Sequence, residues 1–111
     1  MTYRAQLKTG EWVCIPDEAV ADTFAFMGRR WIVHKALASL LGITLPHIIF
    51  RGWDWTVSDV ATGLNIHHHG EATESPDVAV WYALLMLTAA GPARLRRAVR
   101  RARKSMGASR D

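Results

Sequence analysis

Three consecutive histidines offer the clearest metal-ligand chemistry in the chain. If they end a strand, side chains alternate between its two faces, so only His67 and His69 share a face. A structural zinc site needs four ligands, and Cys14 is the single thiol in the sequence. We therefore predict solvated histidines and no metal or cofactor. The alternatives are a zinc ion held within the monomer, or one bridging the two copies of a homodimer.

A cysteine nucleophile with a histidine base is the other chemistry that the residue types would allow. Cys14 and His34 have suitable side chains, but nothing in the sequence brings them together. A lone cysteine in a strand is usually a small buried hydrophobe. The sequence also contains no glycine-rich phosphate loop, paired metal-binding motif or serine elbow. We predict that the protein is not an enzyme.

A dense group of cations near the C-terminus carries the most functional information. Residues 92–111 hold eight Lys/Arg against one acid, a net +7, whereas residues 1–91 hold six Lys/Arg against nine Asp/Glu, a net −3. Seven neighbouring cations with no acid among them repel one another, which indicates an anionic partner. Arginine predominates, and its planar fork suits bidentate phosphate contacts. The predicted nucleic-acid-binding residues are Arg94, Arg96, Arg97, Arg100, Arg101, Arg103 and Lys104.

The leading partner is therefore nucleic acid or a nucleoprotein complex. An acidic membrane surface is the rival partner, but the apolar stripe of the basic segment is mostly alanine and offers no Trp or Phe for insertion. Five tryptophans could stack on bases. Their alternating or helical spacing favours burial instead. Exposure of Trp53 or Trp55 beside Arg51 would reverse that interpretation.

The basic residues belong to a predicted helix over Ala93–Met106. Its apolar positions form one stripe, at offsets of 3, 4, 7 and 11 from the first, made of Leu95, Ala98, Val99, Ala102 and Met106. We expect this helix to protrude from a body that is complete at Gly91. The chain would then divide into a core domain, residues 1–91, and a basic helix with a frayed end, residues 92–111. A chain ending at Gly91 should still unfold cooperatively.

The centre of the predicted body is a hairpin followed by a helix. Large apolar residues alternate with polar ones from Trp53 to Val57, Gly63 supplies a turn, and the alternation resumes to Ile66. Ser75-Pro76-Asp77 has the residue types of a helix start, and Gly91-Pro92 those of a stop.

The helix over 76–90 is apolar on nearly every face, so we expect it to lie deep against the sheet with Trp81 buried. Its uncharged stretch, residues 78–90, is thirteen residues long. A membrane span needs about 20 apolar residues. We predict no membrane insertion.

The remaining segments complete the predicted fold. Tyr3–Leu7 and Trp12–Ile15 alternate and suggest a small hairpin. Apolar residues at helical spacing predict a short helix over about 17–27, and β-rich composition favours a strand over Arg30–Leu37, for which a helix is the alternative. The fold class that follows is α+β, a single antiparallel sheet of four to five strands packed on the 76–90 helix, plus the basic C-terminal helix. The first residues lack a signal peptide's apolar run, and a lone cysteine forms no internal disulfide, so we expect a cytoplasmic protein.

Two segments resemble small proteins of phages and bacterial mobile elements. The strings Trp31-Ile32-Val33-His34-Lys35-Ala36-Leu37 and Gly52-Trp53-Asp54-Trp55-Thr56-Val57-Ser58-Asp59-Val60-Ala61-Thr62-Gly63-Leu64-Asn65-Ile66 carry the resemblance. In that group a strand, a hairpin with a Thr-Gly turn and a helix recur, and some members are compact anti-CRISPR inhibitors. The likeness covers about half of the chain and includes no catalytic motif. The basic tail departs from the acidic surface common among such inhibitors.

Two functional hypotheses follow from these patterns. The first is a non-enzymatic accessory protein that contacts nucleic acid through the basic helix. The second, implied by the resemblance, is an inhibitor that binds a host protein through the sheet or the core helix. Capture from a host lysate with and without nuclease would distinguish them.

Overall fold

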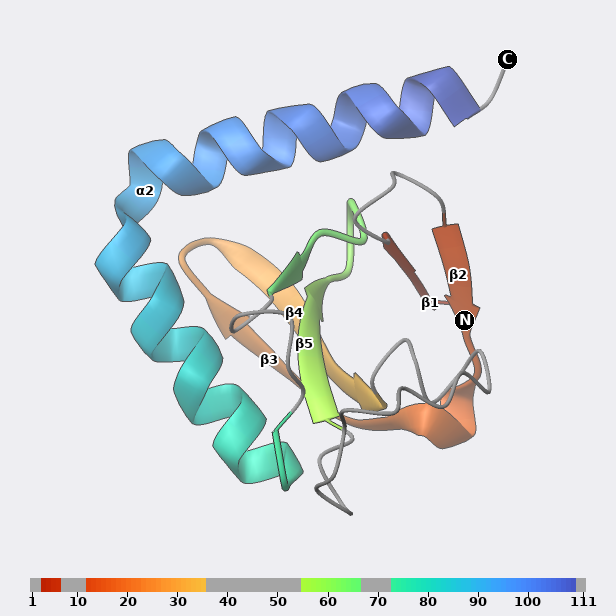
Figure 1. Ribbon diagram of the computed structural model, residues 1–111, viewed down its shortest axis with the longest axis vertical. Helices are drawn as coiled ribbons and strands as arrows, with labels where there is room; N and C mark the ends of the chain where they lie inside the picture. The colour runs from red at the N-terminus through yellow and green to blue at the C-terminus, as the bar shows by residue number, and fades with distance from the viewer. Residues whose placement is uncertain (1–2, 7–11, 36–54, 67–72, 110–111) are drawn as a thin grey trace, which may run out of the picture.

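The computed structural model describes residues 3–6, 12–35, 55–66 and 73–109. In these residues the fold is α+β, as predicted, with a two-stranded sheet, a four-stranded antiparallel sheet and a C-terminal helix packed on the larger sheet (Figure 1). The predictions for Trp53 and for the histidines His67 and His69 lie outside the described residues.

The predicted N-terminal hairpin is confirmed. Strand β1, Tyr3–Gln6, pairs antiparallel with β2, Trp12–Ile15. Ala5 and Ile15 are completely buried in a small apolar cluster with Ala19 and Ile32. This cluster connects the two-stranded sheet to the larger one, because Ile32 lies in strand β4, Arg29–Lys35.

The helix predicted over 17–27 is wrong. A single 3-10 turn, η1, occupies Asp17–Ala19, and strand β3, Val20–Phe26, then pairs antiparallel with β4. The connection is Met27-Gly28, where both residues have positive φ, 53° and 72°. Two such residues between strands match the twist of a tight hairpin. That turn favours a strand over a helix for the apolar side chains of β3. The strand predicted over Arg30–Leu37 is confirmed as far as Lys35, and its last two residues lie outside the described residues.

The predicted central hairpin is also confirmed. Strand β5, Trp55–Asp59, pairs with β4 on one side and with β6, Asn65–Ile66, on the other, which gives the order β3-β4-β5-β6. Gly63 has φ of 74°, and a Cβ at this position would lie 2.9 Å from the Trp12 side chain and 3.0 Å from the Arg4 carbonyl oxygen. Only glycine therefore lets the β5–β6 turn approach β1 this closely.

The helix α2, Pro76–Ser109, begins as predicted. The Val78 N–H donates to Ser75 Oγ at 3.2 Å, which is the predicted cap. Gly91 has non-helical angles, φ 81° and ψ 167°, and splits α2 into an N-terminal segment, 76–90, and a C-terminal segment, 92–109. The two segments meet at a sharp bend, so that the first runs alongside the large sheet and the second crosses one end of it (Figure 1).

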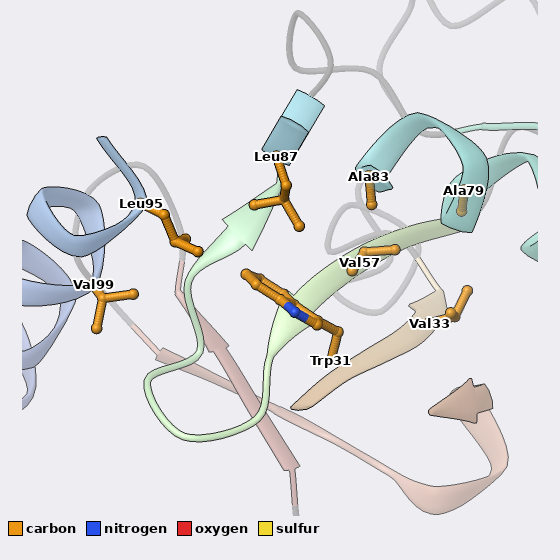
Figure 2. Packing of buried hydrophobic residues seen from close by; sticks show 8 residues of the cluster. All are labelled: Trp31, Val33, Val57, Ala79, Ala83, Leu87, Leu95 and Val99. Atoms are coloured by element: carbon orange, nitrogen blue, oxygen red, sulfur yellow. The ribbon is translucent and has the colours of Figure 1, made fainter. Parts of the chain in front are cut away.

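The main core lies between the large sheet and both segments of α2. It is built from Trp31, Val33, Val57, Ala79, Ala83, Leu87, Leu95 and Val99, and Figure 2 shows these side chains gathered around the Trp31 ring. The prediction of a protruding basic helix is therefore wrong, because Leu95 and Val99 are only 7% and 6% exposed. The Gly91 bend turns the apolar stripe of the C-terminal segment back onto the sheet.

The predicted burial of Trp81 is also wrong. Its side chain is 59% exposed, and Leu85, one helical turn later, is 48% exposed. The face of the N-terminal segment that meets the sheet is instead Ala79, Ala83 and Leu87, one residue per turn. Two small alanines allow the helix to pack closely against the sheet, and the opposite face then remains in solvent.

Candidate nucleic-acid interface

The seven predicted contact residues all lie on the C-terminal segment of α2. All seven are exposed to solvent; they are Arg94, Arg96, Arg97, Arg100, Arg101, Arg103 and Lys104. Among the described residues the ion pair found is Arg29 with Asp59, and it involves none of them. The same segment is fixed to the body, because Gln6 Nε2 donates to the Ala102 carbonyl at 3.0 Å and Leu95 and Val99 enter the core. The segment is thus a docked helix with a cationic outer surface.

Six of the seven cations fall into two rows that border two open grooves. One groove, here called the turn groove, measures about 620 Å³ and lies beside the β3–β4 turn. Met27, Leu95 and Val99 provide its apolar lining, and Arg96, Arg100 and Arg103 its helix wall. Residues at spacings of four and three share one face of a helix, which explains why these arginines form a row.

The second groove, here called the edge groove, lies at the opposite edge of the sheet, beside β6. It measures about 500 Å³. Its apolar lining includes Leu64, Ile66 and Met86, and its helix wall includes Arg94, Arg97 and Arg101. Lys104 lines neither groove. Sequence reasoning identified the cations but missed both grooves, because each forms between the helix and strands distant in the chain.

Arg29 at the rim of the turn groove is already paired. Its Nε and a terminal nitrogen donate to the two carboxylate oxygens of Asp59 at 3.0 and 2.8 Å. Asp59 is 1% exposed, and Oδ2 also accepts from the Thr62 hydroxyl at 2.6 Å and the Thr62 N–H at 3.1 Å. This arrangement satisfies a buried carboxylate and connects β4 to the β5–β6 turn. Arg29 therefore stabilises the rim of the groove, and the cations of this groove without a described acidic partner are those of the helix.

A buried histidine network occupies the middle of the large sheet. His34 is fully buried, with Nδ1 2.6 Å from the Lys35 carbonyl oxygen and Nε2 2.7 Å from Ser58 Oγ. The carbonyl can only accept, so Nδ1 carries the proton and Nε2 accepts from the Ser58 hydroxyl. Asn65 Nδ2 then donates to Ser58 Oγ at 2.8 Å. Burial disfavours the imidazolium and lowers the pKa of His34 from 6.5 to about 4, although the bond to the Lys35 carbonyl opposes this shift.

The Ser58–His34 contact resembles that of a serine nucleophile with its base, but both side chains lie inside the core. Ser58 and His34 are both 0% exposed, so no substrate reaches them. The prediction that Cys14 is buried is wrong, because it lies on the exposed face of β2, opposite Arg4 in the register. The rest of the protein covers one face of this two-stranded sheet, and Ile15 lies on that covered face. Among the described residues no cluster of three metal-ligating side chains is found.

The tryptophans differ in their surroundings. Trp31 is completely buried, and its Nε1 donates to the Phe26 carbonyl at 3.0 Å. Trp55 is half-buried against the main core, and Trp12 is half-buried with the Arg4 guanidinium 5.3 Å from its ring centre. Of the four tryptophans that the structure describes, Trp81 is the exposed one, and its ring meets Tyr82 edge-on at 5.5 Å. Sequence reasoning missed it because an all-apolar helix does not reveal which face turns outward.

By length and composition alone, α2 also meets the requirement for a helix that could cross a membrane. Its most apolar window of 18 residues has a mean hydropathy of 1.4, and 22% of that window is buried. The mostly buried core helix of a soluble protein passes the same test, so length and composition alone do not distinguish the two kinds of helix.

Comparison with known proteins does not assign the chain to a family. No protein-family model matches it, and neither a curated protein nor a solved structure is significantly similar to it.

Proposed function

We propose that the protein binds nucleic acid through the C-terminal segment of α2. The observation that carries this proposal is the set of seven exposed cations, without a described acidic partner, on a helix that is docked rather than free. Holding like charges together on a fixed helix costs free energy, and a polyanion offsets that cost by replacing many weakly bound counterions. The docked helix also carries its charged residues on a backbone that is already fixed, which lowers the backbone entropy lost on binding.

Salt titration of DNA binding tests the proposal. We expect log affinity to fall linearly with log salt, with a slope of about −0.9 for each phosphate contact on duplex DNA and about −0.7 on a single strand. If roughly half of the seven cations engage, the duplex slope is about −3 to −4. Replacing Arg97 and Arg101 by glutamine should weaken binding uniformly across sequences and flatten that slope by about 2.

The matched control removes the same charge from the body. Arg30 and Lys35 are exposed on β4 and line neither groove, so the double variant Arg30→Gln, Lys35→Gln should bind almost as the parent protein does. Equal losses in the two double variants would show a response to net charge alone and refute an interface on α2. Affinity that does not change with salt would refute nucleic-acid binding altogether.

A protein-binding inhibitor is the second candidate function, and the exposed pair Trp81 and Leu85 favours it. Tryptophan is enriched among residues that dominate interface energies, and this pair lies on the N-terminal segment, away from the cations. Capture of one defined protein from nuclease-treated lysate, lost on Trp81→Ala and kept on Arg97→Gln, Arg101→Gln, would support it. The predicted setting in a phage or mobile element stays a prediction.

A further inference from the structure

The grooves beside the C-terminal segment of α2 combine two surfaces that duplex DNA would use unequally. Their walls are cationic and their lining is apolar. Leu95 and Val99 line the turn groove, and Leu64 and Ile66 line the edge groove. A duplex keeps its bases stacked inside and presents phosphates to a protein surface. It would engage the arginines and leave the apolar lining in contact with water.

An unpaired strand presents both complements at once. Its phosphates are anionic, and its unstacked bases offer flat, largely apolar faces that proteins bind by stacking. Both grooves, about 620 and 500 Å³, fall within the range of small-molecule pockets, about 300 to 1,000 Å³. Each is therefore large enough to admit a nucleotide. The first and last arginines of each row are seven positions apart on the helix, or about 10 Å.

The choice of cation points the same way. The helix walls of both grooves are arginine, and the single lysine of the cationic surface lines neither. A guanidinium plane can stack on a base while it donates to phosphate, which an ammonium group cannot do. Among the described residues that line the two grooves none is aromatic, so these guanidinium planes would provide the stacking.

We infer that the nucleic acid bound by this protein is single-stranded, with unpaired bases in the turn groove and the edge groove and phosphates along the arginine rows between them. This inference rests on the proposed function and specifies its partner. The occupant is identified by charge complementarity with the walls together with the apolar lining.

Two labelled probes test the inference by fluorescence anisotropy at one salt concentration. One is a single-stranded DNA of mixed sequence without self-complementarity, and the other is its duplex with the unlabelled complement. Charge alone would favour the duplex, which carries twice the phosphates. We expect the single strand to bind more tightly by about tenfold or more, the equivalent of one base stack.

Filling a groove without changing its charge identifies the site. Ala98 is part-exposed and lines the edge groove, so Ala98→Phe should remove about tenfold of the single-strand affinity and leave duplex binding nearly unchanged. The matched control is Ala93→Phe, the same substitution at an exposed position outside both grooves, which should bind as the parent does. A second variant, Met27→Asn, makes the turn groove more polar at a position with φ of 53°, which asparagine tolerates. It should reduce single-strand affinity in the same way, and it decides the matter if Ala98→Phe fails to fold.

The outcomes separate this inference from the proposed function. Duplex binding as tight as single-strand binding, with Ala98→Phe and Ala93→Phe alike, would overturn the inference and leave nucleic-acid binding intact. Failure to bind either probe would overturn both. Displacement of the single strand by an equally charged glutamate-leucine peptide at lower concentration than by unlabelled single strand would reassign the grooves to an acidic polypeptide.

Discussion

The buried histidine of the large sheet should make the stability of the protein depend on pH in a defined window. His34 is neutral in the folded state because burial lowers its pKa from 6.5 to about 4. Between those two values the unfolded chain binds a proton that the folded chain does not. The free energy of unfolding is therefore unaffected by this group above pH 6.5 and falls as the pH is lowered from 6.5 to 4. Below pH 4 the titration of His34 changes it no further.

The size of the effect follows from the same shift. Each pKa unit corresponds to about 1.4 kcal/mol, so the shift from 6.5 to about 4 gives a loss of about 3 kcal/mol across the window. That is a large part of the roughly 5 to 15 kcal/mol that stabilises a typical domain.

Urea denaturation at a series of pH values, followed by tryptophan fluorescence, measures this loss. His34→Gln is the control, because glutamine can still bond with Ser58 but does not titrate. The variant should be less stable at neutral pH and lose less stability on acidification, so that the two curves converge towards pH 4. Parallel curves for the parent and His34→Gln from pH 7 to 4 would show that His34 titrates equally in both states, and that its burial has no energetic consequence.

Two further predictions concern packing. Leu95→Ala should lower the free energy of unfolding by about 2 to 5 kcal/mol, because Leu95 is 7% exposed within the main core. A chain ending at Gly91 should lose its cooperative unfolding transition, because Leu95 and Val99 are then missing from that core. A sharp transition in the shortened chain would show that the body is complete without the docked segment. Trp81→Ala should cost less than about 1 kcal/mol, whereas Trp31→Ala should cost about 3 to 5 kcal/mol, and equal shifts in thermal midpoint would contradict the exposure of Trp81.

Local signals predicted the parts of the fold that depend on neighbouring residues. The turn at Gly63 and the helix cap at Ser75 follow from residue type alone, and both are present. The β3–β4 hairpin was missed because Met27 must adopt positive φ, which a methionine does not signal in sequence. A few apolar residues also fit the helical and the strand period about equally well, and pairing with β4 decides between them.

The candidate interface was predictable only in part, for a related reason. The charge of residues 94 to 104 is a property of composition, so the cations were found. The direction of the helix that carries them depends on the backbone angles of Gly91. A Gly-Pro pair marks where a helix ends but does not say where the chain goes next. The grooves depend on that direction, because their other walls come from the Met27 turn and from Leu64.

The contact between Gln6 and Ala102 has a consequence for the order of folding during synthesis. These residues lie 96 positions apart, so β1 meets its helical partner only after the residues between them have been synthesised. Strands β3 to β6 are available earlier, at a synthesis rate of about 5 to 20 residues per second. Until then the apolar surface around Trp31 lacks the cover that Leu95 and Val99 provide. The arginine-rich segment thus completes the core last, and the sheet face that it covers stays exposed for several seconds of synthesis.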